Sequence, residues 1–363
     1  MSRIVIDARE LRTSTGRYVE RLLFYLQQMD NKNKYKVLLK PEDMEGWRPN
    51  NTNFEKIACS IKEFTFAEQT DLKKQIEGLK PALVHFPIVQ QPVRYKGAAV
   101  TTIHDLTTLR FINPAKNPIV FRIKQKVYAY IIKTAAHKSK FVITPSNFVK
   151  EDLLDYTKVD ESKIVVTYEA ADYITDPSEP VLELEGMKFL MYVGRPTPHK
   201  NLWRLIEAYA LLKKKYPKLK LALAGKKDFN YMQIEQKVKE KGIRGVIFTD
   251  FISEGQLKWM YEHCEAYVFP SLSEGFGLPG LEAMVHGAPV ASSNASCLPE
   301  IYGKAAKYFD PKDVNDMFES IDELLSDPIL KKKLISEGKK RAQEYSWETM
   351  AKQTLEVYKR ALS

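Results

Sequence analysis

Short apolar runs alternate with longer amphipathic stretches along the whole chain. In the first half, six runs rich in apolar and β-branched residues predict buried strands at residues 4–6, 35–39, 83–86, 98–103, 141–144 and 164–167. Apolar residues at helical spacing predict helices among them, at residues 17–28, 68–80, 119–138 and 147–155. This alternation is typical of a mostly parallel sheet covered by helices.

The alternation starts again after a change of composition. Residues 172–185 contain Pro177, Pro180 and five acids without a Lys or Arg, which indicates a linker. Beyond it, further strands are predicted at residues 189–193, 219–224, 246–248, 266–269 and 289–292. We therefore expect two tandem α/β domains, residues 1–175 and 186–345, with a C-terminal helix over residues 346–363 that packs back on the first domain.

Composition describes an ordinary globular protein. Hydrophobic residues make up 44% of the chain and charged residues 28%, and no apolar run approaches the ~18 residues of a membrane span. The first ten residues, MSRIVIDARE, carry charges of both signs, which argues against a secretory signal. The three cysteines lie far apart without a CxxC pair, so neither a disulfide framework nor a zinc site is predicted. We expect a cytoplasmic protein.

The net charge of +10 is concentrated in one segment. No acidic residue occurs between Asp105 and Glu151, and residues 119–140 combine Lys and Arg with Ile, Val and Tyr as a basic amphipathic helix. An anionic membrane surface, reached from its inner face, or an anionic acceptor would suit such a helix. A solvated helix face is the plain alternative, and nucleic acid is the less favoured one.

The stretch PSLSEGFGLPGLE, residues 270–282, combines the features of an anion site. It follows the predicted strand 266–269, contains three glycines, and leads into a helix for which Pro279 suits the first turn. The start of a helix presents unpaired N–H groups to an anion. Glu274 on the turn and Glu282 in the helix, separated by seven residues, suit a ligand with hydroxyl groups as well as phosphate, such as a nucleotide-sugar.

Other candidate residues occupy the loops that follow predicted strands. His104 comes directly after the strand 98–103, where functional loops of a parallel sheet lie, although a satisfied buried histidine is the alternative. Gly16 ends the first loop without a GxGxxG fingerprint, so alone it indicates little more than a helix start. Arg195 and Lys200 follow the strand 189–193, and each by itself could be a surface cation or a helix-start residue.

Taken together, these motifs resemble the retaining glycosyltransferases of family 4. The match covers most of the chain and is densest over residues 192–311, with VGRPTPHKN at 193–201 and EGFGLPGLE at 274–282. TIHDL at 102–106 and TGRYV at 15–19 add to it. The resemblance implies the GT-B fold, an α/β architecture of two Rossmann-like domains whose parallel sheets face a central cleft. The chain departs from the family pattern at TSTG, residues 13–16, and at YEAAD, residues 168–172.

The resemblance also implies roles for residues of the second domain. Glu282 would hold the ribose hydroxyls of a donor nucleotide, and Glu274 would bind hydroxyls of the transferred sugar. Arg195 and Lys200 would neutralise the charge of the departing diphosphate. The backbone N–H groups of Phe276, Gly277 and Leu278 would help to hold the sugar and phosphate.

Two residues of the first domain complete the implied site. His104 would reach across the cleft to the donor sugar. Gly16 would allow the backbone to approach the phosphate or the acceptor closely. No DxD motif occurs in the chain, which agrees with transfer that needs neither a metal nor another cofactor.

We therefore expect a retaining hexosyltransferase of cell-envelope polysaccharide biosynthesis. Its donor would be a nucleotide diphosphate sugar, GDP-mannose before a UDP-sugar, and its acceptor a glycan or a lipid-linked glycan. Two alternatives remain at this point: a nucleotide-sugar epimerase on the same tandem fold, or a non-catalytic nucleotide-sugar-binding protein.

Overall fold

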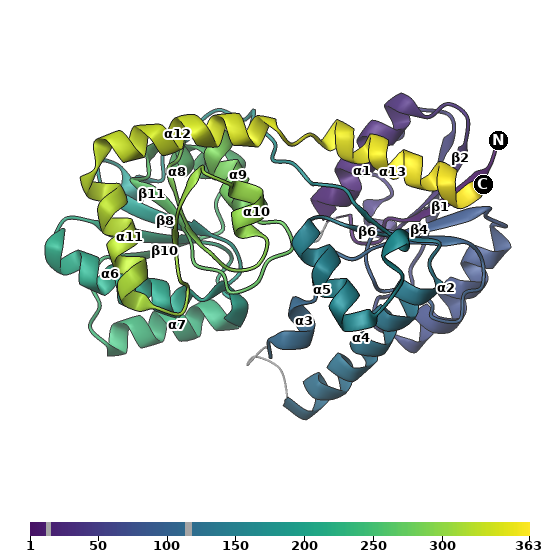
Figure 1. Cartoon of the computed structure of the whole chain (residues 1–363), viewed down its shortest axis with the longest axis horizontal. Coiled ribbons are helices and arrows are strands. Elements are labelled where there is room, and N and C mark those ends of the chain that lie inside the picture. The colour runs from purple at the N-terminus through teal and green to yellow at the C-terminus, as the bar shows by residue number, and fades with distance from the viewer. Residues whose placement is uncertain (12–15, 113–117) are drawn as a thin grey trace. The chain divides into compact units, whose positions relative to one another are not determined.

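The computed structural model describes residues 1–11, 16–112 and 118–363 and divides the chain into two compact units (Figure 1). The first unit consists of Met1–Leu109, Arg122–Glu169 and the C-terminal Ser346–Ser363. The second consists of Arg110–Phe121 and Ala170–Tyr345. The first unit thus ends at Glu169, six residues before the boundary expected at 175, and a short internal segment groups with the second unit.

A seven-stranded parallel sheet forms the centre of the first unit, in the order β3-β2-β1-β4-β5-β6-β7. Its strands are β1 (Arg3–Asp7), β2 (Lys34–Leu39), β3 (Phe54–Ala58), β4 (Leu83–Phe86), β5 (Ala99–Thr102), β6 (Phe141–Thr144) and β7 (Ile164–Val166). In β1, Ile4 lies between Tyr35 of β2 and Leu83 of β4, so the strand order reverses beside β1. Such a reversal is the usual binding edge of a doubly wound sheet.

The helices of the first unit include the end of the chain. They are α1 (Gly16–Met29), α2 (Phe66–Gly78), α3 (Thr107–Arg110), α4 (Pro118–Lys138), α5 (Asn147–Thr157) and α13 (Trp347–Leu362). Helix α13 packs on α1, and the buried Tyr358 Oη lies 2.6 Å from His85 Nδ1 on β4. Burial lowers the pKa of His85 to about 3, so this imidazole is neutral and joins the helix to the sheet by hydrogen bonds alone.

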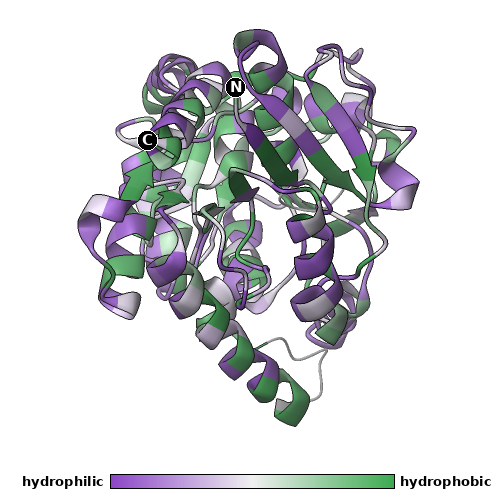
Figure 2. Cartoon of the chain, turned by 90° about the vertical axis from the view of Figure 1, so that its right-hand side faces the viewer, coloured by the Kyte–Doolittle hydropathy of each residue, from purple (hydrophilic) through white to green (hydrophobic). Residues whose placement is uncertain are grey.

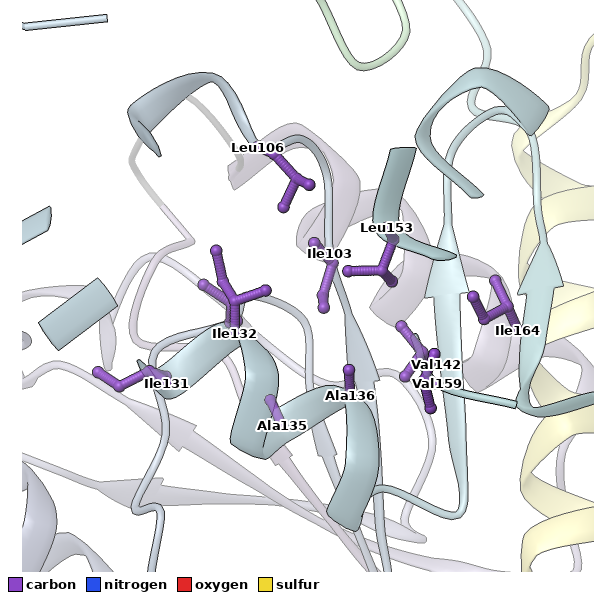
Figure 3. Close-up of a cluster of buried hydrophobic side chains, with 11 residues drawn as sticks. Ile103, Leu106, Ile131, Ile132, Ala135, Ala136, Val142, Leu153, Val159 and Ile164 are labelled. Carbon is purple, nitrogen blue, oxygen red and sulfur yellow. The ribbon is translucent and has the colours of Figure 1, made fainter. Parts of the chain in front are cut away.

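One face of α4 completes the core on that side of the sheet. Figure 3 shows Ile132, Ala135 and Ala136 of α4 beside Ile103, which follows β5, and Leu153 of α5. Coloured by hydropathy, the helices carry hydrophobic and hydrophilic turns side by side, including α4, which reaches lowest in Figure 2. A helix with one apolar face against the sheet is what the spacing at residues 119–138 predicts.

The second unit has a six-stranded parallel sheet in the order β10-β9-β8-β11-β12-β13. Its strands are β8 (Phe189–Val193), β9 (Lys220–Ala224), β10 (Val246–Asp250), β11 (Ala266–Phe269), β12 (Val290–Ser293) and β13 (Ala306–Phe309). Its helices are α6 (Leu202–Lys215), α7 (Phe229–Glu240), α8 (Glu254–His263), α9 (Leu278–Val285), α10 (Leu298–Tyr302), α11 (Val314–Ser326) and α12 (Pro328–Gln343). The prediction of two α/β units with parallel sheets is confirmed.

Candidate functional site

The loop after β8 is fixed to neighbouring strand ends by one asparagine. Asn201 adopts a left-handed conformation (φ 59°), which asparagine tolerates better than most residues, and begins α6. Its Nδ2 donates to the carbonyl of Pro270 at 3.0 Å and to that of Pro311 at 2.7 Å, after β11 and β13 respectively. The carbonyl of His199 accepts from the Leu272 amide at 2.7 Å. The loops after β8 and β11 are therefore joined at the carboxyl edge of the sheet.

Lys200 and Glu274 meet where these two loops join. Lys200 Nζ lies 2.6 Å from Glu274 Oε1, and both side chains are largely buried, at 18% and 12% exposure. The ammonium group also lies 5.4 Å from the centre of the Phe269 ring. A short charge-assisted contact between poorly hydrated partners holds both groups in a defined place. The structure thus pairs two of the residues that the motifs predict to be functional.

Neighbouring groups hold Glu274 from the backbone side. Its amide donates to Ser296 Oγ at 3.1 Å, and its carbonyl accepts from Cys297 Sγ at 3.4 Å. The carboxylate therefore faces Lys200 while its backbone is fixed by the segment before α10. Arg195 lies on the same loop as Lys200 but is exposed, and its side chain has no hydrogen bond or ion pair within the described residues. Lys200 is held in place, whereas Arg195 points to solvent.

The turn after β11 needs its glycines for packing. Gly277 caps α9 with φ 92°, and its carbonyl accepts from Tyr302 Oη at 2.5 Å. A Cβ on Gly277 or Gly280 would lie 2.6 or 2.2 Å from the same hydroxyl oxygen. Helix α9 therefore sits directly on Tyr302, with Phe276 before it and Leu278 as its first residue. Within the first turn of α9, Pro279 has no N–H group and the Gly280 amide donates to the Gly277 carbonyl at 3.2 Å, so the amide of Leu278 is the one that this turn offers to an anion.

Glu282 lies one turn into α9 and is buried, at 7% exposure. Tyr261 Oη donates to its Oε2 at 3.3 Å. The backbone carbonyl of Glu282 lies 2.8 Å from Nδ1 of His286, whose Nε2 accepts from the Ile174 amide at 3.1 Å. Because Nε2 accepts, Nδ1 must be the donor and the imidazole is neutral; burial lowers its pKa accordingly.

His104 lies in the first unit, two residues after β5, with both ring nitrogens bonded. Nε2 lies 2.9 Å from the carbonyl of Pro87, which can only accept, and Nδ1 lies 3.0 Å from Glu169 Oε1. Burial opposes the positive charge, but the Glu169 carboxylate outweighs it, and the pKa of His104 is raised above its usual value. Tyr18 packs edge-on against the imidazole ring, with 4.8 Å between the two ring centres. His104 is therefore held by hydrogen bonds inside its own unit, in surroundings that favour the protonated ring.

Gly16 is the buried first residue of α1. A Cβ there would lie 2.0 Å from the Leu11 carbonyl oxygen, so glycine is required by the chain's own backbone. Most of the TSTG sequence that precedes the helix lies outside the described residues. Close approach of a ligand at Gly16 stays a prediction.

The structure brings together the predicted residues of the second unit, Lys200, Glu274, Glu282 and the turn at Phe276–Leu278, at one edge of one sheet. His104 and Gly16 are placed in the first unit, and their roles toward a ligand stay predictions. Four partners were not foreseen from the sequence: Asn201, Tyr261, Tyr302 and Glu169. Of these four, Asn201 alone could have been predicted from the sequence, because it directly follows Lys200 in the loop motif and asparagine tolerates the left-handed conformation found at this helix start.

Two absences apply to the described part of the chain only. No group of three or more His, Cys, Asp or Glu side chains there is arranged to hold a metal ion. No described helix is both long enough and apolar enough to cross a bilayer.

Two family models match successive parts of the sequence. Residues 53–173 match the family described as Glycosyltransferase Family 4, and residues 176–341 match that described as Glycosyl transferases group 1. The second match contains the loop with Lys200 and the whole turn from Glu274 to Glu282.

Curated relatives include several mannosyltransferases. The O-antigen chain mannosyltransferase B of Escherichia coli is 31% identical over 77% of this chain and 74% of its own length. The O-antigen chain mannosyltransferase RfbU of Salmonella typhimurium is 29% identical over 58% of this chain and 56% of its own. The serotype-specific mannosyltransferase WbdA of Escherichia coli is 29% identical, but this chain covers only 28% of its length.

Several solved structures share the fold at low sequence identity. Sucrose-phosphate synthase of Thermosynechococcus elongatus superimposes over 99% of both chains with a TM-score of 0.79 at 18% identity. Anabaena HepE, solved in complex with UDP-glucose, covers 99% of this chain and 100% of its own with a TM-score of 0.75 at 16% identity. These likenesses, with the two parallel-sheet units, establish the GT-B fold.

Proposed function

The chain belongs to glycosyltransferase family 4, and from this membership we propose that it transfers mannose from GDP-mannose to a cell-envelope glycan of the O-antigen type. That it is a glycosyltransferase follows from the family models and the relatives. The choice of mannose and of an O-antigen-type acceptor is supported by the mannosyltransferases that are about 30% identical to it. The retaining outcome and the absence of a metal requirement are part of the proposal.

The observation that carries the proposal is the Lys200–Glu274 contact of 2.6 Å beside the start of α9. It places a cation, a carboxylate and the start of a helix, with the Leu278 amide, within one pair of joined loops. A diphosphate needs a cation and N–H donors, and a sugar offers hydroxyls to the carboxylate. Before a donor binds, Glu274 neutralises Lys200; a bound donor would share the cation between Glu274 and its phosphate.

The chemistry asked of these groups is electrostatic. In the proposed step, the bond between the anomeric carbon of mannose and the β-phosphate oxygen breaks, and a bond to an acceptor hydroxyl oxygen forms on the same face. Negative charge grows on the departing GDP, where Lys200 and the exposed Arg195 would stabilise it. The proton of the acceptor hydroxyl leaves to the released phosphate, so the protein need not supply a covalent nucleophile.

Glu282 fits a separate task from Glu274. Its carboxylate is buried beside the Tyr261 hydroxyl on a helix that is packed on Tyr302, so it is rigidly placed. A fixed carboxylate can accept hydrogen bonds from two hydroxyl groups at once, which is how a ribose can be recognised. We assign Glu282 to the donor ribose and Glu274 to the transferred sugar.

A donor screen tests the proposal. The purified protein is supplied with GDP-mannose, UDP-glucose and related nucleotide-sugars together with envelope glycan, and release of nucleoside diphosphate is followed. We expect release from GDP-mannose that depends on the glycan. Glu274→Ala should lower kcat by about 100-fold, because a contact made in the transition state is removed.

The matched control is Glu319→Ala, which removes a carboxylate from the exposed side of α11. This variant should keep the activity of the unaltered protein. Equal turnover by the Glu274→Ala and Glu319→Ala variants would refute the site. Absence of nucleoside diphosphate release with every donor would favour the non-catalytic alternative.

A further inference from the structure

Helix α4 carries an exposed apolar strip on the side away from the core. Ile123, Val127 and Tyr130 are 59%, 53% and 63% exposed. At about 100° per residue they fall within an arc of roughly 60°. The opposite face, with Ile132 and Ala136, is buried in the core (Figure 3). The strip is thus a second apolar face, which the fold of this unit does not require.

Cations border this strip. Arg122 and Lys126 lie on one side of it by helical position, and Lys124 lies on the other. All three side chains are exposed. The sequence from Asp105 to Glu151 contains no acidic residue between these two, so the surrounding segment adds no negative charge. An apolar strip with cations on both sides is the pattern of a helix that lies in a membrane interface.

A cation-lined cavity lies at the C-terminal end of the same helix. Its volume is about 420 Å³, and five of its seven lining residues are cations: Lys73, Lys74, Arg94, Lys96 and Lys138. An adjoining cavity of about 210 Å³ shares Lys96 and Lys138 and reaches Thr134. Thr134 and Lys138 follow Tyr130 at intervals of four residues, so they continue the face of α4 that carries the apolar strip.

Most of these cations are not neutralised within the protein. Lys73 has Glu77 at 3.1 Å, and Lys138 donates to the carbonyl of Val93 at 2.8 Å. Lys74, Arg94 and Lys96 have no carboxylate within ion-pair distance among the residues that the structure describes. Cations kept close together without acids repel one another, and an external anion removes that repulsion.

We propose that this face of the first unit binds an anionic membrane surface, with a lipid phosphate in the cation-lined cavity and the strip of α4 in the headgroup region. The two features belong together because a single helix face carries the strip and leads into the cavity. Ile123 and Val127 offer nothing to a nucleic acid, which would need stacking or hydrogen-bonding groups, but they suit acyl chains. The proposal is independent of the donor sugar, because binding requires no turnover.

Vesicle co-sedimentation tests the proposal on the full chain without nucleotide-sugar. Vesicles of phosphatidylcholine alone are compared with vesicles that also contain phosphatidylglycerol. We expect binding only to the anionic vesicles, falling as salt screens the cations. Replacing Lys74, Arg94 and Lys96 together with Ser should weaken binding on the order of 100-fold, since each cation near such a surface contributes about fivefold. Ile123→Ser with Val127→Ser should weaken it at least about tenfold.

Matched variants in the second unit test whether the loss of binding is specific to this surface. One control replaces three exposed helix lysines with Ser and so removes the same charge: Lys214, Lys332 and Lys333. The other control removes two exposed apolar side chains, by Ile329→Ser together with Met232→Ser. These controls should bind the vesicles as the unaltered protein does, and circular dichroism should show all variants folded. Equal losses in the controls, no binding to anionic vesicles, or binding to RNA in place of vesicles would each overturn the proposal.

Discussion

His104 lies beside carboxylates that raise its pKa, and this makes its protonation measurable. Both acceptors that face the ring, the Pro87 carbonyl and Glu169, favour a proton on each nitrogen. Burial favours the neutral ring, and Glu169 is the first of the groups that raise the pKa against it, followed by the Pro87 carbonyl and Asp105. Because the folded pKa is raised, the pair stabilises the fold fully below pH about 6.5, and this contribution is lost as the pH rises through the folded pKa.

Glu169→Gln should therefore lower the pKa of His104 relative to that in the unaltered protein. Burial is then opposed only by the Pro87 carbonyl and Asp105, and NMR titration of the ring protons measures the fall. The stability that the pair contributes below pH about 6.5 should disappear in the same variant. The pKa of His286, which burial lowers in the second unit, provides an internal reference that should not change. A His104 pKa in Glu169→Gln equal to that of the unaltered protein would contradict the assignment.

Individual residues were predicted where the sequence motif itself carries the chemistry. Lys200 and Glu274 are separated by 73 residues in the chain, yet the structure brings them into contact, because the loops after β8 and β11 are neighbours in a parallel sheet. Residues that bind these side chains but belong to no recognisable motif could not be predicted from the sequence. Glu169 lies in YEAAD, which departs from the family pattern, and its contact with His104 depends on the register of β5, β6 and β7.

Helix α9 is held close to its neighbours by two glycines, and that packing predicts a large difference between two similar substitutions. Gly280→Ala would place a Cβ 2.2 Å from Tyr302 Oη in a buried site, and we expect it to destabilise the protein by about 3 kcal/mol. Gly78→Ala, at the end of α2, meets nothing within 4 Å and should leave stability unchanged or raise it by roughly 0.5 kcal/mol. Urea unfolding followed by circular dichroism measures both.

The comparison of these two variants is decisive because both glycines lie in helices and neither has a positive φ. Helix propensity alone predicts that each alanine would be favourable. Similar free energies of unfolding for the two variants would mean that α9 does not pack on Tyr302 as the structure has it.

Apolar periodicity predicted most of the strands and the long helices. The strands β3 and β13 were missed, and both lie at sheet edges, where one side lacks a neighbour. Their sequences, FEKIA and AKYF, mix charged and apolar residues because edge strands remain partly exposed. The start of α9 was predicted at Pro279, which suits a first helical position, and the helix begins one residue earlier, at Leu278.

The two-unit organisation was predicted from the repeated alternation of strands and helices. The strand order within each sheet was not, since apolar runs do not say which strands are neighbours. The grouping of the last helix with the first unit follows from contacts between α13 and α1 and from the His85–Tyr358 hydrogen bond, which join residues 273 positions apart. No local pattern in the sequence indicates this pairing, so the expectation that the helix over residues 346–363 packs back on the first domain rested on the two-domain architecture alone.

Sugar transfer itself is tested most directly by a proton NMR time course with GDP-mannose and envelope glycan. We predict that the anomeric signal of the donor decays while GDP and a new glycosidic anomeric signal appear, with the configuration of the donor retained. The same mixture without glycan should leave the donor unchanged. Conversion of the donor into a second nucleotide-sugar without any glycan would contradict the transferase and identify an epimerase.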